Sequence, residues 1–167
     1  MNKEVLEQAQ NLIMRVSMLD TKNIGRVATL DEIKSLQKDL DNRVPAWYIE
    51  LISTIPLINL EFGFQEFEPE EGFDGISYLT WAEPDTIKEE CIDAVPGCAV
   101  FDKGYICIAS CSHSSGDPFF ISIDEGYNPP VYRMDHNYGE DTEDILMMGK
   151  YKIAESLSNL FKNAFIE

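Results

Sequence analysis

The stretch SGDPFFISIDEGYNPPVYRMDHN, residues 115–137, decides the fold of this chain, because it reads as a loop, a strand, a turn and a second strand. Residues 114–118 are turn formers, and residues 119–124 follow with the two-residue alternation of a pleated strand. The double proline at 129–130 ends that alternation. Because neither proline can donate a hydrogen bond to a sheet, the second strand can begin only at Val131.

Further strands are predicted on the N-terminal side of this stretch. The run at residues 105–109 is apolar throughout, which is typical of a strand in the interior of a sheet. The acidic segment 66–74 contains a proline and a glycine, and we expect it to be a hairpin loop. The other predicted strands cover residues 58–64, 76–81 and 99–101.

Apolar residues three and four positions apart predict helices at both ends of the chain and one helix within the sheet region. Thr29 and Glu32 have the spacing of a capping box at a helix start. Pro45 and Pro84 suit the first turn of a helix. The predicted helices cover residues 3–19, 30–40, 45–55, 84–92 and 150–165.

This order of elements predicts the α+β class, because helices gather at the ends of the sequence and strands in its middle. We expect an antiparallel-leaning sheet of about six strands, flanked by N-terminal helices and a C-terminal helix. The chain has 167 residues, of which 44% are hydrophobic. That length and composition predict one domain, residues 1–167, with a core that is stable without disulfides or a metal.

The pieces together resemble the SUKH superfamily, which unites bacterial immunity proteins with fungal cell-wall synthesis regulators. Members carry a Gly-Asp pair before an aromatic-rich strand, here Gly116 and Asp117. A Pro-Val-Tyr strand follows at residues 130–132 and ends near Asp135 and His136. The resemblance covers residues 30–165 and includes a Pro-x-x-Tyr helix start at 45–48 and a strand-to-helix passage at 78–90. One departure is the sequence IPLI at 55–58, where many members have an Asn-Gly turn.

The resemblance implies a non-enzymatic cytoplasmic protein that binds a toxin domain and neutralises it. Many toxins neutralised by such relatives act on nucleic acid, and such enzymes are commonly basic, so a basic nuclease is one candidate partner. The alternative is a regulatory or scaffold module for protein interaction, as the fungal relatives imply. A neighbouring reading frame for a large, modular secreted protein with a basic C-terminal domain would favour immunity.

The formal net charge of −17 restricts the class of partner. Phosphate binding needs clusters of Lys and Arg, so the charge argues against nucleic acid, and equally against an anionic membrane. It favours a basic protein. Residues 1–45 hold seven acidic and seven basic groups, whereas residues 61–93 hold eleven acidic groups and one base. The acid in 61–93 is either a solvated face kept for solubility or an electrostatic docking surface.

The candidate partner-binding residues come from this acidic stretch and from the motif that carries the resemblance. They are Glu68, Glu70, Glu71, Asp74, Trp81, Glu83, Asp85, Asp117, Asp135 and His136. Tryptophan is enriched in binding hot spots, so Trp81 can belong to an interface or to the core, whereas Trp47 lies on an apolar helix stripe and is predicted to be core. Asp117 can form a turn or bind a partner.

The four cysteines are separated by six, eight and three residues, a spacing without the close C-x-x-C pairs of a zinc site. We predict reduced, structural thiols, with a disulfide or a metal site as alternatives. The N-terminus lacks the apolar run of a signal peptide, and no run approaches the roughly 18 apolar residues of a membrane helix. A cytoplasmic protein, monomeric or weakly homo-oligomeric, is therefore expected.

Sequence motifs for catalysis are missing: the chain has no G-x-S-x-G, P-loop or H-E-x-x-H. A hydrolase would need Cys111, His113 and Asp117 to converge in one pocket. Asp135 and His136 are neighbours, and neighbours in a strand point to opposite faces. The acidic pairs lack the ligand spacing of a calcium loop. We predict no catalytic residue, no metal and no cofactor.

Overall fold

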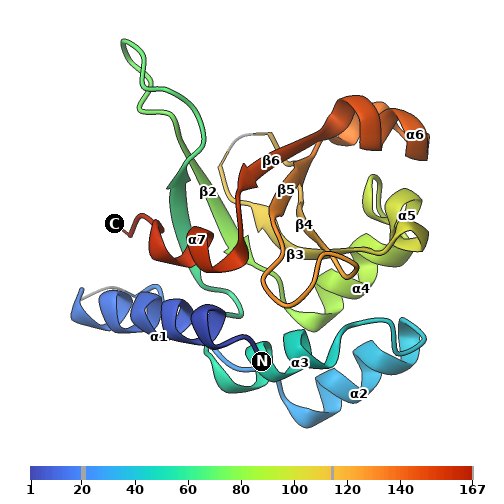
Figure 1. The fold of residues 1–167 in the computed structure, drawn as a ribbon, viewed down its shortest axis with the longest axis horizontal. Helices are drawn as coiled ribbons and strands as arrows, with labels where there is room; N and C mark the ends of the chain where they lie inside the picture. The colour runs from blue at the N-terminus through green and yellow to red at the C-terminus, as the bar shows by residue number, and fades with distance from the viewer. Residues whose placement is uncertain (20–21, 114, 167) are drawn as a thin grey trace.

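The sheet lies at the centre of the fold. The computed structural model describes residues 1–19, 22–113 and 115–166, and it contains a six-stranded, curled sheet (Figure 1). The strands follow one another in chain order, each antiparallel to the next. They are β1 (Glu61–Gln65), β2 (Ile76–Trp81), β3 (Tyr105–Cys111), β4 (Phe119–Ser122), β5 (Val131–Met134) and β6 (Lys150–Ala154). The α+β class and the six-stranded antiparallel sheet are confirmed.

Strands β4 and β5 come from the stretch that decided the fold. Strand β5 begins at Val131, directly after the double proline, as the missing proline N–H groups require. Phe119 of β4 is opposite Arg133 of β5, and Phe120 is opposite Tyr132. The turn before β4 was predicted to include Ser114, which lies outside the described residues.

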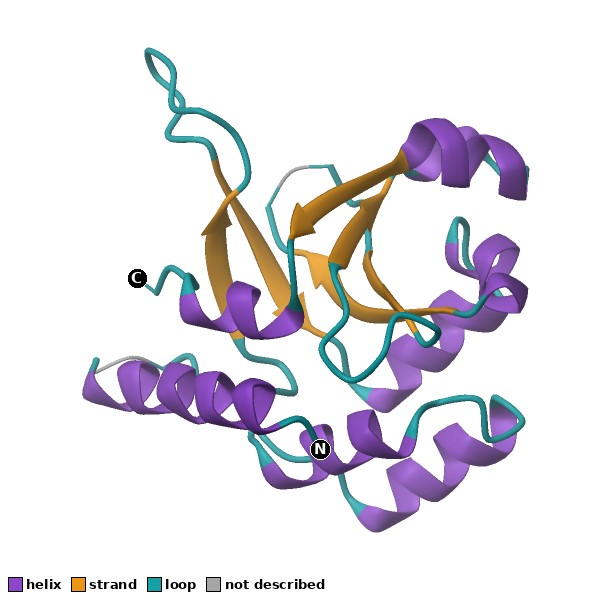
Figure 2. Cartoon of the chain, in the orientation of Figure 1, coloured by secondary structure: helices purple, strands orange, loops and turns teal. Residues whose placement is uncertain are grey.

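Helices lie on several sides of the sheet (Figure 2). The capping box of the second helix is confirmed: the Thr29 hydroxyl accepts from the Glu32 N–H, and the Glu32 carboxylate accepts from the Thr29 N–H. No described helix is both long and apolar enough to span a bilayer. The helices are α1 (Lys3–Met18), α2 (Leu30–Asp39), α3 (Ala46–Thr54), α4 (Pro84–Ile92), α5 (Gly97–Val100), α6 (Thr142–Asp144) and α7 (Leu157–Lys162), with the short turns η1 (Phe101–Lys103), η2 (His136–Tyr138) and η3 (Ile145–Gly149).

The main core extends from Val5 in α1 to Ala164 beyond α7. Arg15 joins these two ends of the chain, because its guanidinium donates to the carbonyl oxygens of Phe161 and Ala164 at 2.6 and 2.8 Å. Trp47 is buried in this core, as its place on the apolar stripe predicted.

A second, smaller core lies on the other face of the sheet. It contains Cys107 of β3, Phe120 of β4 and Val100 of α5. Both faces of the middle strands are therefore covered, which explains why residues 106–109 are fully buried and apolar without interruption. The predicted place of this run in the sheet interior is confirmed.

The predicted strand at residues 58–64 begins later than the alternation indicated. Ile58 forms an isolated bridge with Arg26, and β1 starts at Glu61. Between them Asn59 has a φ of 64°, a left-handed conformation that asparagine tolerates better than most residues. This turn interrupts the extended chain although the apolar alternation continues through it.

Two other predictions from local pattern were wrong. Residues 99–101 are not a strand, because they belong to α5 and η1, where Val100 packs into the second core. The predicted C-terminal helix over residues 150–165 is divided: β6 takes its first part, and α7 begins only after the Ser156 hydroxyl caps it by accepting from the Asn159 N–H. The six strands therefore include β6 in place of residues 99–101.

Candidate interaction surface

The antiparallel order brings three connections to one end of the sheet. Because successive strands reverse direction, the segments between β1 and β2, β3 and β4, and β5 and β6 all emerge at the same end. These segments are residues 66–75, 112–118 and 135–149, and we call them together the acidic end. They contain five, one and five carboxylates respectively, and no lysine or arginine.

The first of these segments, residues 66–75, is the hairpin loop, which projects from the sheet at the upper left of Figure 1. Its base is closed by the Gly75 carbonyl, which accepts from the N–H groups of Glu66 and Phe67 at 3.0 Å. The Gln65 side chain donates to the carbonyls of Phe67 and Asp74 at 2.8 and 2.7 Å. Gly75 has a φ of +75°, and a Cβ there would lie 2.2 Å from the Phe67 oxygen, so this turn requires glycine.

Two phenylalanines of the hairpin loop contact each other on its surface. The ring centroids of Phe67 and Phe73 are 6.0 Å apart, and the residues are 45% and 47% exposed. Backbone hydrogen bonds in both directions between Glu70 and Phe73 close the tip, at 2.8 and 3.0 Å. We call Phe67 and Phe73 the aromatic pair.

A hydrogen-bonded network around the Arg133 side chain joins the base of the hairpin loop to the other two segments. Arg133 of β5 donates from Nε to Glu66 at 2.7 Å and from its terminal nitrogen to Asp117 at 2.9 Å. Asp117 also accepts from the His136 backbone N–H at 3.2 Å, and its Oδ1 lies 2.6 Å from His136 Nδ1. We call Glu66, Asp117, Arg133 and His136 the ion network.

Three of the four side chains in the ion network are shielded from water. The side chains of Glu66, Asp117 and Arg133 are 7%, 4% and 15% exposed, whereas that of His136 is 44% exposed. Burial alone raises the pKa of Asp117, but hydrogen bonds from His136, Ser115 and Arg133 outweigh burial and lower that pKa below its usual value. Asp117 is therefore an ionised, structural group, and its role goes beyond forming the turn before β4.

A metal ion would compete with the ion network. Among the described residues, Asp117, Asp135 and His136 offer ligand atoms within 4.8 Å of one another. Both Asp117 oxygens, however, already accept hydrogen bonds from Arg133 or His136. Asp135 caps η2 by accepting from the Asn137 N–H at 2.7 Å. The donor geometry favours paired charges over cation coordination.

Apart from Trp81, the sequence-predicted site residues lie in three separate places. Glu68, Glu70, Glu71 and Asp74 are exposed on the hairpin loop. The second place, also at the acidic end, holds Asp117, Asp135 and His136. Glu83 and Asp85 lie at the start of α4, beyond the opposite end of β2, where Glu83 pairs with Arg26 at 3.1 Å.

Trp81 was a candidate partner-binding residue, but its burial shows that it belongs to the core and not to an interface. Trp81 is fully buried in the main core, with its ring 5.3 Å from Phe161 and 6.4 Å from Phe62. Its side chain has no surface to offer a partner in the folded protein. The reason is that α7 covers the face of β2 on which Trp81 lies, an arrangement that the alternation in β2 does not reveal.

Of the residues that a hydrolase would need, Cys111 and Asp117 both lie beside Arg133, whereas His113 lines a different hollow. Cys111 lines a cavity of about 180 Å³ with Glu66 and Arg133. His113 lines another hollow, and its Nε2 lies 3.4 Å from a Glu61 oxygen, whereas Asp117 belongs to the ion network. In the described part of the chain, no disulfide joins any of the four cysteines. Burial raises the pKa of Cys91 to about 11, which disfavours the reactive thiolate.

Four residues of this surface were not among the predicted site residues: Glu66, Phe67, Phe73 and Arg133. Arg133 carried a usable signal, because it is the one lysine or arginine between Lys103 and Lys150 and it lies in a predicted strand among many acids. The aromatic pair had a weaker signal, since two phenylalanines within an acidic, glycine-containing loop have no core to enter.

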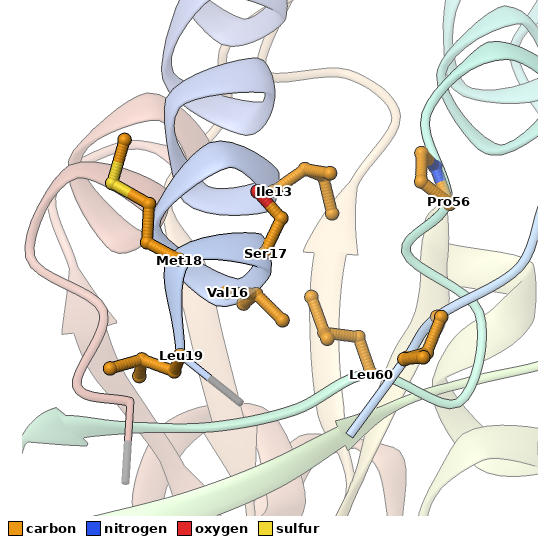
Figure 3. A pocket seen from close by; sticks show the side chains of 9 residues that line it. Ile13, Val16, Ser17, Met18, Leu19, Pro56 and Leu60 are labelled. Atoms are coloured by element: carbon orange, nitrogen blue, oxygen red, sulfur yellow. The ribbon is translucent and has the colours of Figure 1, made fainter. Parts of the chain in front are cut away.

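An apolar groove lies away from the acidic end. It has a volume of about 470 Å³, and its walls come from the end of α1 and from the segment around Pro56 and Leu60 (Figure 3). Met18 and Ile24 on its rim are 82% and 78% exposed. Its described lining residues offer hydrophobic contact and one polar side chain, that of Ser17.

Comparison with known proteins agrees with the fold and with the motif order. No curated protein and no solved structure matched the chain. Residues 27–163, from the segment before α2 to the end of α7, match the SMI1 / KNR4 family (SUKH-1), and the chain therefore belongs to this family.

Proposed function

We propose that this protein is a cytoplasmic immunity protein that binds a basic toxin domain through the acidic end and blocks its activity. Membership of the SMI1 / KNR4 family supports a protein-interaction role of the immunity or regulator type. The three connections at one end of the sheet hold eleven carboxylates and no lysine or arginine. Glu66 and Asp117 are buried against Arg133, and the observation that carries the proposal is the other nine, which lie in residues 66–75 and 135–149.

The charge distribution suits such a partner physically. A toxin that acts on nucleic acid has a basic active-site region, and a surface of carboxylates imitates the phosphate charge that this region attracts. Complementary charge accelerates encounter and prevents binding of partners with like charge. In this proposal residues 1–167 act as one domain, monomeric or weakly homo-oligomeric, with no direct contact to nucleic acid or membrane.

A regulatory or scaffold role is the second candidate, because the matching family is named for SMI1 and KNR4 as well as for SUKH. The same acidic end would then recognise a cellular protein. The neighbouring reading frame separates the two roles: a large secreted protein with a basic C-terminal domain favours immunity, and a housekeeping gene favours regulation.

Charge reversal on the hairpin loop tests the proposed docking surface. Changing Glu68, Glu70 and Glu71 together to lysine is expected to slow association with the basic domain encoded next to this gene by roughly tenfold or more at low salt. Dissociation should change less, because long-range attraction acts mainly on encounter. Stopped-flow rates at several salt concentrations provide the measurement, and the difference should shrink near 0.15 M, where the screening length is about 8 Å.

The matched control changes Asp85, Glu89 and Asp93 to lysine. These three residues are exposed on or directly after α4, away from the acidic end, and their reversal alters the net charge by the same amount. Both variants should fold, since exposed charges contribute little to stability. Equal slowing by the two variants would show that net charge alone steers the partner and would reject the acidic end as the docking surface.

A further inference from the structure

The aromatic pair lies on the hairpin loop and belongs to neither core of the protein. Phe67 and Phe73 contact each other on a projecting loop, and each leaves nearly half of its surface in water. Single exposed apolar residues are ordinary. Two touching phenylalanines in a segment with carboxylates at positions 68, 70, 71 and 74 are a small apolar surface with an acidic rim.

We propose that the aromatic pair is the apolar anchor of the partner interface, and that the partner presents an apolar pocket rimmed by lysine and arginine. This inference rests on the proposed function and specifies the partner's surface. Interface cores are enriched in aromatic residues, and a few such anchors carry most of the binding free energy. The acidic rim selects the partner, because its carboxylates complement a basic rim and repel an acidic one.

The ion network holds the anchor in position. Glu66 directly precedes Phe67, and both of its carboxylate oxygens are engaged: one accepts from Arg133 at 2.7 Å and the other from the Ser77 hydroxyl at 2.6 Å. A loop with so many like charges would otherwise spread by self-repulsion. Arg133 thus acts as a positioning residue, fixing the base of the hairpin loop to β5.

Because the anchor is already ordered in the free protein, less conformational entropy is lost on binding. Ordering a loop during association reduces affinity, and a loop that is already ordered avoids this loss. Truncating the anchor, or releasing the base of the loop, should therefore accelerate dissociation. Association at low salt should change little in either case, because the carboxylates that steer the partner remain.

Alanine replacement of Phe67 or of Phe73 tests the anchor against the basic domain encoded by the neighbouring reading frame. Each change is expected to accelerate dissociation about 30-fold, the effect of losing one hot-spot residue. Phe165→Ala is the matched control, because Phe165 is 49% exposed and lies beside Gly63 outside the hairpin loop. Unchanged dissociation in both loop variants would overturn the anchor.

Glu66→Gln tests the ion network without needing a partner. The variant keeps the shape of the side chain and loses its charge, so hydrogen exchange at the N–H groups of Phe67, Glu70 and Phe73 should accelerate about tenfold, with β3 unaffected. Dissociation of the basic domain should accelerate by a similar factor. Glu155→Gln is the control, because Glu155 forms an exposed pair with Lys152. Unchanged exchange in the hairpin loop would overturn the positioning role.

The outcomes separate this inference from the proposed function. If charge reversal slows association but the phenylalanine variants dissociate normally, the acidic end docks the partner and the anchor is rejected. If the neighbouring domain does not bind the wild-type protein, the proposed function fails and the anchor fails with it. The exchange experiment on Glu66→Gln still decides the role of the ion network in either case.

Discussion

Replacing Phe161 by alanine is expected to lower the free energy of unfolding by about 3–5 kcal/mol. The Phe161 ring is fully buried, 5.3 Å from Trp81 and 6.4 Å from Phe62, so its removal leaves a cavity where α7 meets the sheet. Its backbone carbonyl also accepts from Arg15, which ties α1 to the same place. Urea unfolding of both proteins, monitored by tryptophan fluorescence, measures the difference.

Phe165→Ala serves again as a control, because the Phe165 ring is half exposed. Its replacement should change the free energy of unfolding by no more than about 0.5 kcal/mol. A melting temperature of Phe161→Ala equal to that of the wild-type protein would show that α7 does not cover the core. The α1–α7 contact would then also have to be revised.

Replacing Asp117 by asparagine is expected to lower the free energy of unfolding by about 3 kcal/mol at neutral pH. The change removes the charge that faces Arg133 and His136 but keeps the side-chain size, so the buried guanidinium loses one of its two carboxylates. Asp93→Asn is the matched control, because Asp93 is exposed after the last turn of α4. That control should stay within about 0.5 kcal/mol of the wild-type protein.

The effect of Asp117→Asn should depend on pH in a defined direction. The ion network lowers the pKa of Asp117 in the folded state, so on acidification the unfolded chain takes up this proton first. The contribution of Asp117 is complete above the unfolded pKa of about 3.9 and is lost as the pH falls through the lower folded value. The wild-type and variant stabilities should therefore converge in acid, and an equal gap at pH 7 and at about pH 3 would contradict an ionised Asp117.

Local sequence determined much of the sheet and several helix ends in advance. The double proline placed the start of β5 at Val131, because a missing N–H is a property of the residue itself. Thr29 and Glu32 placed the start of α2 for a similar reason, since a capping box closes within four residues. The apolar run in β3 indicated a strand with both faces covered, as the two cores confirm.

Where the local sequence pattern is compatible with both a helix and a strand, tertiary contacts decided which of them forms. Ile153, Leu157 and Leu160 are spaced as in a helix, yet residues 150–154 form β6, because β5 would otherwise leave one edge without hydrogen-bond partners. Val100 lies in a helical turn, and its side chain packs in the second core. Burial of Trp81 depended on α7, whose residues lie about eighty positions further along the chain.

In the candidate site, too, some features follow from the sequence and others from tertiary contacts. Composition and motif order determined that this chain is an acidic α+β protein of the SUKH type, because charge and periodicity are properties of segments. The ion network could not be predicted in this way: Glu66 and Arg133 are 67 residues apart, and they meet because the curled antiparallel sheet brings the hairpin loop back to β5. Pairing of buried charges depends on distance in space, which only the folded chain sets.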